Sequence, residues 1–380
     1  MNVSVATAER EMLDVASKFA CEHFRPNDLR ELRDGTMGLC DIRARWQKMA
    51  ELGWVGMVLP ESRGGEGGGF ADLTAVLRAL GRSLATVPFA TSLTSMLAIE
   101  HGTEAGYYDG VLCDICRGEL LVVPAFGHSP RFSAVRPDTV DVVARRASSG
   151  HFLSGAATRV LDAPLADKLL IAARLESATY AEGLALFLVD IDAPGLSLEP
   201  GMLIDSRTVA TAEFDAVPVD ADAMVVVPSR AIAAIDVALD RAAVAVAAEL
   251  FGVAEEAFDR TIEYLMIREQ FGVPIGAFQA LQHRAAQLLC SLELSGAILS
   301  HASKAIDAST EEVADLASVC KAQLSDTAVH VAEEAVQMHG GIGVCDECDI
   351  GLFLKRARVL EWMLGDSAYH RDRYATRNNF

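Results

Sequence analysis

One stretch decides the fold of this 380-residue chain: Tyr264-Leu265-Met266-Ile267-Arg268-Glu269-Gln270-Phe271-Gly272-Val273-Pro274-Ile275-Gly276-Ala277-Phe278-Gln279. The pattern predicts a helix that ends at Gly272, a tight glycine and proline link, and a second helix that starts near Ala277. Arg268 then lies in the last turn of the first helix, where its guanidinium complements the helix dipole and can hold a phosphate. Gln279 opens the second helix, whose first N–H groups favour an anion. With Phe271 between them, these helix ends can grip a diphosphate and its adenosine, although a solvated surface arginine has the same spacing.

The same stretch resembles the signature of the acyl-CoA dehydrogenase family, R-x-x-F-G followed by G-x-F-Q. An independent match lies near the amino terminus. There, residues 46–56 resemble W-x-x-L-A-E-L-G-W-x-G, residues 60–67 resemble P-E-x-x-G-G-x-G, and residues 78–85 resemble E-E-L-G-R-x-L-A. Two separate matches are improbable by chance, and the resemblance covers nearly all of the chain. It implies a helical domain, a β-barrel and a helical bundle, in that order.

Composition and charge exclude several classes of protein. Hydrophobic residues make up 51% and charged residues 23%, which is ordinary for a soluble protein of two or three domains. No apolar run has transmembrane length and no basic and apolar leader is present, so we expect a cytoplasmic protein without a membrane span. The net charge of −20 argues against nucleic acid or an anionic membrane as partner. Positive charge for a phosphate must then be confined to local sites such as Arg268.

The eight cysteines are scattered along the chain. Two pairs have C-x-x-C spacing, Cys113 with Cys116 and Cys345 with Cys348. Together they can be drawn as a four-cysteine zinc site, but most of the chain separates the pairs and no turn-rich knuckle surrounds either. The pattern therefore favours free thiols in a reducing compartment and no metal site.

The periodicity of apolar residues predicts a mainly α protein with a β middle domain. Helical spacing covers residues 4–24, 40–52 and 72–83, within a helical N-terminal domain of residues 1–118. Short β-type runs bounded by glycine, proline and aspartate fill a small barrel or sandwich of residues 119–228. A four-helix bundle takes residues 229–380. The β runs are Thr139–Arg146, His151–Leu161, Lys168–Leu175, Gly183–Ile191 and Thr208–Val217.

Long helical patterns make up the bundle. One runs over residues 242–267, with Gly252 allowing close approach of another helix, and a second runs over residues 278–306. Ser309 and Glu312 have the spacing of a capping box, which predicts a third helix that runs to His339 and stops at Gly340. The glycine run of residues 64–69 lacks the spacing of a phosphate loop, so we expect a turn there.

The resemblance implies FAD as the cofactor. In this family the R-x-x-F-G and F-Q residues, with a Q-x-x-G-G run from the bundle, hold the ADP half of FAD. The matching positions here are Arg268, Phe271, Gln279, Gln337, Gly340 and Gly341. The family's architecture implies that these residues reach the flavin of a neighbouring subunit.

The positions that would frame the chain's own flavin ring depart from the family pattern. A T-E-P-x-x-G-S-like stretch is expected at residues 123–130, where the sequence does not match. In a G-x-x-x-W-x-T-N-A-like run over residues 155–163, Arg159 stands at the tryptophan position and Leu161 at the threonine position. An arginine cannot give the flavin an apolar wall without burying its charge.

The carboxylate base is missing from its usual place. The Y-E-G-T-like motif aligns with residues 363–366, which puts Leu364 at the base position. Some members place the glutamate on the first long bundle helix, but that position is Ala242, preceded by Asp240 and Arg241. Asp366 is a weak candidate for a relocated base, ahead of Glu361, and a solvent-facing turn residue is the alternative for Asp366.

Together these features resemble a base-lacking subunit of the heteromeric α2β2 acyl-CoA dehydrogenases of actinobacterial steroid and cholesterol side-chain degradation. We therefore expect an acyl-CoA thioester as substrate, a related dehydrogenase subunit as partner and electron-transfer flavoprotein as acceptor. Two alternatives stay open. One is a self-sufficient homo-oligomeric dehydrogenase that uses Asp366 as base. The other is a non-enzymatic paralogue that binds acyl-CoA or a partner.

Overall fold

The structure is a computed structural model that describes residues 7–127, 139–176 and 183–380. The chain forms two compact units, each assembled from segments that are distant in sequence. Unit 1 combines Met1–Thr36, Gly69–Ala85 and Ala243–Phe380, and unit 2 combines Met37–Gly68 and Thr86–Ala242. The three-domain division at residues 118 and 228 stays a prediction.

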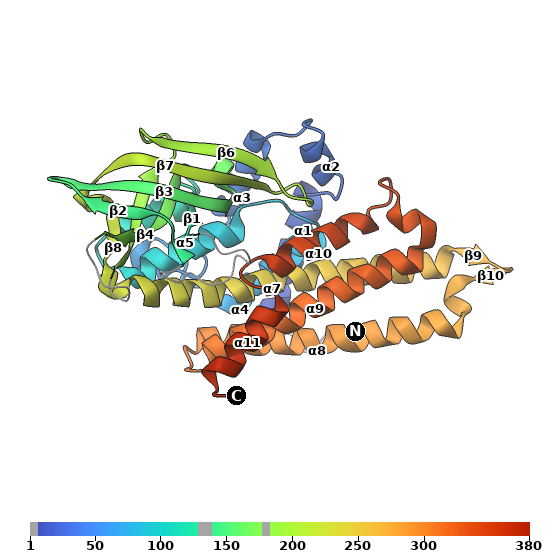
Figure 1. The fold of residues 1–380 in the computed structure, drawn as a ribbon. Helices are drawn as coiled ribbons and strands as arrows, with labels where there is room; N and C mark the ends of the chain where they lie inside the picture. Colours follow the sequence, from blue (N-terminus) through green and yellow to red (C-terminus); the bar gives the residue numbers. More distant parts are fainter. Residues whose placement is uncertain (1–6, 128–138, 177–182) are drawn as a thin grey trace. The chain divides into compact units, whose positions relative to one another are not determined.

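A single mixed sheet forms the centre of unit 2 (Figure 1). Its strand order is β6-β7-β3-β2-β4-β5-β8, and β1 pairs in parallel with β4. Strands β4 and β5 are buried almost throughout, so they read as continuous apolar runs, whereas β7 alternates between buried and exposed residues. The strands are β1 (Val122–Ala125), β2 (Val143–Arg146), β3 (Gly150–Leu161), β4 (Lys168–Leu175), β5 (Leu184–Asp190), β6 (Leu196–Met202), β7 (Thr208–Asp220) and β8 (Met224–Val226).

Each of the five predicted β runs overlaps one strand of this sheet. The three strands that the prediction missed are short or exposed. β1 and β8 have four and three residues, and β6 is exposed along most of its length. Unit 2 also contains α3 (Leu39–Glu51), the 3-10 turn η1 (Glu61–Arg63), α5 (Phe89–Gly102), α6 (Asp109–Cys116), and the turns η3 (Ala163–Leu165) and η4 (Ala221–Ala223).

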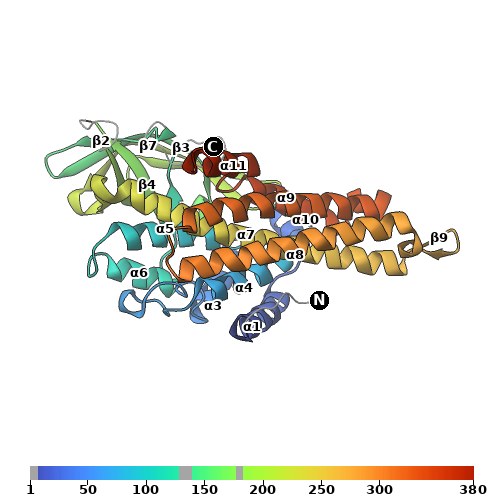
Figure 2. The same cartoon turned by 90° about the horizontal axis from the view of Figure 1, so that it is seen from below.

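Unit 1 is a helical bundle. Figures 1 and 2 show that its long helices run alongside one another, and α8, α10 and α11 all contact α9. The unit contains α1 (Thr7–His23), α2 (Asp28–Arg33), α4 (Phe70–Arg82), the part of α7 (Pro228–Ile267) from residue 243, β9 (Glu269–Gln270), β10 (Val273–Pro274), η5 (Ile275–Ala277), α8 (Gln279–Asp307), α9 (Val313–His339), η6 (Gly340–Val344), α10 (Ile350–Trp362) and α11 (Ser367–Arg377). The predicted fold class, mainly α with a β middle region and a C-terminal bundle, is confirmed.

Two glycines let α4 and α7 approach closely inside unit 1. A Cβ atom at Gly252 would lie 2.0 Å from the carbonyl oxygen of Arg78, and one at Gly81 would lie 2.2 Å from that of Glu249. Since real Cβ atoms do not tolerate such distances, both positions require glycine. The predicted role of Gly252 is therefore confirmed.

Two local predictions were wrong. The helix expected to end at Gly272 ends at Ile267, and the next helix starts at Gln279, because the residues between them form a β-hairpin and a 3-10 turn. The capping box is absent. Ser309 adopts φ +51° and stops α8, so Glu312 is left as the N-cap residue of α9 without a side-chain cap bond.

Among the described residues, no helix is both long enough and apolar enough to cross a membrane.

Candidate functional site

Arg268 and Phe271 belong to a β-hairpin at the end of the bundle. β9 and β10 pair in antiparallel register, and the turn between them consists of Phe271 at φ +56° and Gly272 at φ +81°. Two consecutive residues with positive φ are typical of the type I′ turn that closes a two-residue hairpin. The backbone N–H of Ile275 donates to the carbonyl oxygen of Arg268 at 2.8 Å, which anchors the base of the hairpin.

The side chains of Arg268 and Phe271 are both exposed. Phe271 is 92% exposed, an unusual state for a large aromatic ring on a free surface. The guanidinium of Arg268 makes no ion pair or hydrogen bond within the part of the chain that the structure describes. The Arg268 guanidinium is therefore open to a ligand, and its role in binding stays a prediction.

The N-terminus of α8 lies beside the hairpin tip. Phe278 is its N-cap residue and makes no side-chain cap bond, so the first N–H groups of α8 are not capped by that side chain. The rings of Phe271 and Phe278 meet edge to face with centroids 6.1 Å apart. Gln279, the first residue of α8, is exposed. An anion at this helix end would find both an uncapped dipole and exposed polar side chains.

The Q-x-x-G-G run ends α9. Gln337 is exposed, and Gly340 adopts φ +65° and ψ −142°, a conformation that side chains exclude. Gly341 differs, because its φ is not positive and a Cβ atom there would meet nothing within 4 Å. The contacts of this chain therefore do not explain the glycine at 341.

Tyr264 and His339 join these two segments. Tyr264 stacks on His339 with centroids 4.3 Å apart, one turn before Arg268 and next to Gly340. The six residues predicted to grip FAD thus come from segments that meet at one end of the bundle, and all six are exposed. These residues fit the ADP half of FAD in chemistry: a free guanidinium, an uncapped helix end, amide side chains and an open glycine.

Apolar side chains surround this end of the bundle. Their exposed fractions are 68% for Met266, 76% for Ile267, 50% for Ile342 and 78% for Val344. Together with Phe271, they are large apolar side chains that the chain itself leaves exposed on these segments.

The positions for the chain's own flavin ring differ from those of the family. Residues 128–130 of the first expected stretch lie outside the described residues. In the second stretch, Arg159 sits at φ +55° in a bulge of β3 and is half-buried, and Leu161 is buried. Neither side chain offers the hydroxyl or the indole that the family pattern has there.

Leu364 occupies a tight turn between α10 and α11. Leu364 has φ +59° and Gly365 φ +104°, and Asp366 is the N-cap residue of α11. The Asp366 carboxylate accepts a hydrogen bond from the backbone N–H of Tyr369 at 2.7 Å. This contact gives Asp366 a structural role as a helix cap.

A buried lysine, which the sequence gave no reason to expect, holds this turn. The Nζ of Lys321 donates to the carbonyl oxygens of Glu361 at 2.9 Å and Gly365 at 2.8 Å, and to Ser325 Oγ at 3.0 Å. Its side chain has no solvent exposure, and burial lowers the pKa of Lys321 to about 7, while Glu361 and Asp366 oppose that shift.

His370 closes the same turn from the other side. Its Nε2 lies 2.9 Å from the carbonyl oxygen of Leu364. Burial, with a smaller contribution from the nearby Lys321 cation, lowers the pKa of His370 to about 3. The turn at the base position is therefore rigidly held although it carries no base at 364.

The alternative base position also lacks a free carboxylate. Ala242 is fully buried, and Asp240 is 7% exposed. The half-buried Arg241 donates to the carbonyl oxygen of Val237 at 3.5 Å. Burial lowers the pKa of Arg241, and Glu100 and Asp240 raise it.

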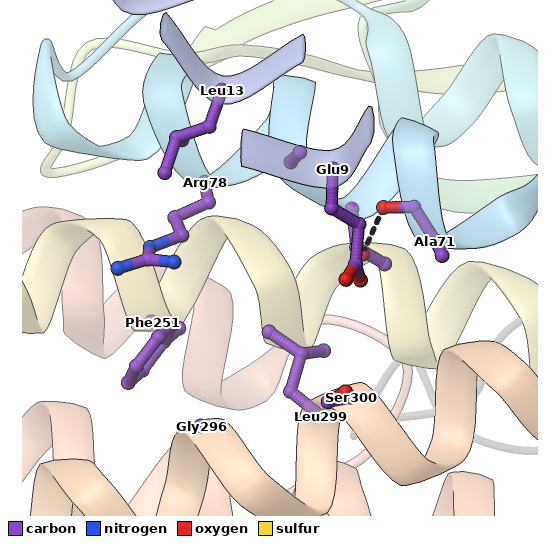
Figure 3. Close-up of a pocket in the computed structure, with 10 residues that line it drawn as sticks. Glu9, Leu13, Ala71, Arg78, Phe251, Gly296, Leu299 and Ser300 are labelled. Atoms are coloured by element: carbon purple, nitrogen blue, oxygen red, sulfur yellow. Dashed lines mark hydrogen bonds between the residues drawn. The ribbon is translucent and has the colours of Figure 1, made fainter. Parts of the chain in front are cut away.

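Two hollows among the described residues are lined by residues other than the predicted site residues. One in unit 1, of about 50 Å³, lies among α1, α4, α7 and α8, where Arg78 extends over the ring of Phe251 (Figure 3). That volume holds a water molecule or two, far less than a flavin or an acyl group needs. A hollow of about 590 Å³ in unit 2 lies against the turn between β2 and β3, lined by Arg146, His151 and Glu176 among others.

All eight cysteines are free thiols. Cys113 and Cys116 lie on α6 in unit 2, and Cys345 and Cys348 lie in the turn after η6 in unit 1. Burial raises the pKa of the Cys116 thiol to about 12.

Comparisons with known proteins match this fold and these motifs. The acyl-CoA dehydrogenase N-terminal domain matches residues 7–118, and the acyl-CoA dehydrogenase C-terminal domain matches residues 232–378. The acyl-CoA dehydrogenase FadE12 of Mycobacterium tuberculosis is 28% identical over 324 residues, which cover 83% of this chain and 82% of that protein.

Solved structures agree over nearly the whole chain. A variant of the Tcur3481-Tcur3483 steroid ACAD superposes with a TM-score of 0.82 at 30% identity, over 97% of this chain and 96% of that one. The ChsE4-ChsE5 complex from Mycobacterium tuberculosis gives 0.84 at 25% identity, over 100% and 99%. A glutaryl-CoA dehydrogenase from Mycobacterium smegmatis, solved with FADH2, shares the fold with a TM-score of 0.87 at 20% identity, over 98% and 94%. The chain belongs to the acyl-CoA dehydrogenase family.

Proposed function

We propose that this chain is the subunit without a catalytic base in a heteromeric, FAD-dependent acyl-CoA dehydrogenase. In this arrangement Arg268, Phe271 and Gln279, with Gln337, Gly340 and Gly341, complete the FAD site of a related, base-bearing subunit. One observation carries the proposal: these residues are exposed and open at one end of the bundle, while Leu364 stands where a base is needed.

The chemistry divides between the two subunits. Bound FAD would supply the acceptor for the hydride that leaves the β-carbon of the thioester as a carboxylate removes the α-proton. Arg268 would hold the diphosphate through its guanidinium, and the open backbone at Gly341 would let the cofactor lie close. The carboxylate would come from the partner, because neither Leu364 nor Ala242 can take a proton.

The related proteins support a heteromer and suggest a substrate class. The ChsE4-ChsE5 complex contains two different chains, and the Tcur3481-Tcur3483 protein is a steroid ACAD. We therefore propose an α2β2 assembly that oxidises an acyl-CoA thioester in the cytoplasm, with steroid side-chain thioesters as the first class to test and electron-transfer flavoprotein as the acceptor.

The test is the visible spectrum and the flavin-to-protein ratio of the chain purified alone and after co-expression with a candidate partner dehydrogenase. We expect a colourless chain alone and about one FAD per pair of chains in the complex, bleached by an acyl-CoA. Yellow protein from the chain alone, with about one FAD per chain and bleaching by an acyl-CoA, would contradict the heteromer. Colourless protein in both preparations would favour a non-enzymatic paralogue.

A further inference from the structure

Gly340 and Gly341 begin the 3-10 helix η6, and a turn follows it at residues 345–349. Besides the hydrogen bonds inside η6, this segment has backbone bonds from Cys345 N–H to Ile342 at 3.0 Å and from Cys348 N–H to Cys345 at 3.2 Å, and the Cys345 thiol lies 3.4 Å from the Gly341 carbonyl oxygen. Most of its residues are exposed. A turn of this kind needs outside contacts to keep one conformation.

Arg30 of α2 makes such contacts with the backbone of residues 340–349. Its Nε donates to the carbonyl oxygen of Asp346 at 2.8 Å, and its Nη2 donates to the same oxygen. Its Nη1 donates to the Asp349 carboxylate at 2.7 Å. The Arg30 side chain is only 14% exposed; its bond to Asp349 is partly buried, and its bonds to the Asp346 carbonyl oxygen lie at the surface. Two donors on one carbonyl fix the orientation of that peptide group.

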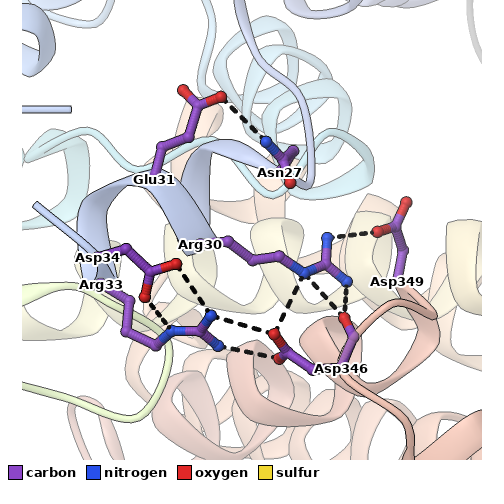
Figure 4. Close-up of polar contacts among 7 residues, drawn as sticks. All are labelled: Asn27, Arg30, Glu31, Arg33, Asp34, Asp346 and Asp349. Atoms are coloured by element: carbon purple, nitrogen blue, oxygen red, sulfur yellow. Dashed lines mark hydrogen bonds and ion pairs between the residues drawn. The ribbon is translucent and has the colours of Figure 1, made fainter. Parts of the chain in front are cut away.

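Arg33 lies one helical turn further along α2 and holds the side chain of the same aspartate. Its Nη1 and Nη2 donate to the two oxygens of Asp346 at 2.9 and 3.1 Å, and its Nε donates to Asp34 at 2.8 Å (Figure 4). The hydrogen bonds from Arg33 hold the pKa of the Asp346 carboxyl below its usual value. This fork geometry is specific to arginine.

The far end of the turn is tied down as well. Asp349 precedes α10, and its second oxygen lies 3.4 Å from Nη1 of Arg260 on α7. The Asp349 carboxylate thus lies between a cation from α2 and one from α7. The turn is held at Asp346 and Asp349, and its other end is fixed by the stacking of His339 on Tyr264.

We propose that Arg30 and Arg33 are positioning residues for FAD: they hold the turn so that Gly340 and Gly341 present their backbone to the cofactor. The inference rests on the proposed function, since it assumes that these glycines meet FAD. Neither arginine touches the cofactor in this arrangement. Their effect passes through Asp346 and Asp349.

The test combines two measurements on the same variants. Hydrogen exchange of the peptide that covers residues 340–349 reports the order of the turn. Titration of FAD, in whichever form of the wild type binds it, reports affinity. Arg33→Gln removes the fork on Asp346, and Asp346→Asn removes its carboxylate but keeps the carbonyl that Arg30 holds. Arg25→Gln is the matched control, because within the described residues the Arg25 side chain forms ion pairs with Asp28 and Glu31 alone, at 3.5 and 3.9 Å, and is 68% exposed.

We expect faster exchange of the turn and a rise of roughly 5-fold in the FAD dissociation constant for Arg33→Gln and Asp346→Asn. Arg33→Lys should recover part of the affinity, and Arg25→Gln should match the wild type in both measurements. Two results for Arg33→Gln and Asp346→Asn would overturn the positioning role: faster exchange with an FAD affinity equal to that of the control, or an exchange rate that does not change. A wild type that binds no FAD, either alone or with a partner, would instead contradict the proposed function, and this result is recognised without any variant.

Discussion

Tyr264 at the end of α7 stacks on His339 at the end of α9, with ring centroids 4.3 Å apart and ring planes 18° from parallel. The Tyr264 hydroxyl also donates to the carbonyl oxygen of His339 at 3.4 Å. This pair sets the spacing between the hairpin of Arg268 and the turn of Gly340. The residues proposed to bind FAD come from two segments that α8 and α9 separate in sequence. The stack of Tyr264 on His339 is a direct contact between these segments.

Replacing Tyr264 by leucine should separate the two segments. Loss of the stack should lower the free energy of unfolding by about 1 kcal/mol. It should weaken FAD binding by more than the factor of about 5 that corresponds to this free energy. Urea unfolding and FAD titration measure the two effects. Tyr264→Phe keeps the stack and loses only the long hydrogen bond, so it should behave nearly as the wild type. Equal losses in both variants would show that the hydroxyl, and not the stack, sets the spacing.

Arg268→Gln should reduce FAD affinity without loss of stability. The guanidinium has no partner within the described residues, so its removal leaves no buried group unpaired. Loss of a charged hydrogen bond to a diphosphate costs about 1.5–3 kcal/mol, or roughly 10- to 100-fold in affinity. Arg117→Gln, at the C-cap of α6 with a side chain 65% exposed, is the control. An unchanged flavin content in Arg268→Gln would remove this residue from the site.

The Asp366 variants distinguish a helix cap from a base. Asp366→Ala should lose about 1 kcal/mol of stability because the N–H of Tyr369 loses its acceptor, whereas Asp366→Asn keeps an efficient cap. Turnover of the assembled enzyme should be unchanged in both. Initial rates with an acyl-CoA and thermal unfolding provide the comparison. A large fall in kcat for Asp366→Asn, with normal stability, would instead support the self-sufficient enzyme.

The sequence predicted the sheet and the long helices well where periodicity was strong. The run Lys168–Leu175 was predicted with the bounds that β4 has, because it contains a continuous apolar stretch, residues 169–173, between Lys168 and Arg174. Helix α5 went unrecognised because 12 of its 14 residues are buried, so it has no polar face and no amphipathic pattern.

The error at the hairpin has a different cause. Phe271 adopts a left-handed conformation that aromatic residues rarely take, and no local propensity indicates it. The assignment of Arg268, Phe271 and Gln279 to the FAD site does not depend on this error, because it rests on motif spacing, and it stays a prediction. Lys321, Arg30 and Arg33 were not found. A buried lysine inside an apolar stripe, and two arginines three residues apart on a six-residue helix, look like ordinary polar positions until distant segments are brought to them.

Glu249→Gln should destabilise the bundle strongly. Arg356 is fully buried, and its Nη1 donates to Glu249 at 3.0 Å and to the carbonyl oxygen of Ala85 at 2.8 Å. The change removes the carboxylate charge that faces a buried cation, and breaking a buried ion pair costs about 3–5 kcal/mol. Glu333→Gln is the control, because its partner Arg358 is 42% exposed and a surface pair contributes about 1 kcal/mol or less. Similar midpoints of urea unfolding for the two variants would contradict this.

Lys321 should make stability rise with pH in the alkaline range. Its folded pKa of about 7 lies below the ordinary value of 10.5, so between these values the unfolded chain binds a proton that the folded chain does not. Stability contributed by the neutral lysine is complete above pH 10.5 and is lost as pH falls to 7. The slope of the unfolding free energy can reach about 1.4 kcal/mol per pH unit. Lys321→Met should lack this slope and lose the bonds to Glu361 and Gly365.

His370 allows the two titrations in this turn to be separated. With a folded pKa of about 3 against an ordinary 6.5, its stabilising contribution is complete above pH 6.5 and lost as pH falls towards 3. His370→Gln should therefore flatten the acidic limb of the stability profile and keep the alkaline limb, whereas Lys321→Met should do the reverse. Urea unfolding at half-unit intervals from pH 4 to pH 10, with the three proteins side by side, measures both limbs. An alkaline limb that persists in Lys321→Met would mean that another buried group titrates in this range. Lys321 would then stay charged in the folded chain, because its hydrogen bonds to the carbonyl oxygens of Glu361 and Gly365 replace those it makes to water in the unfolded chain.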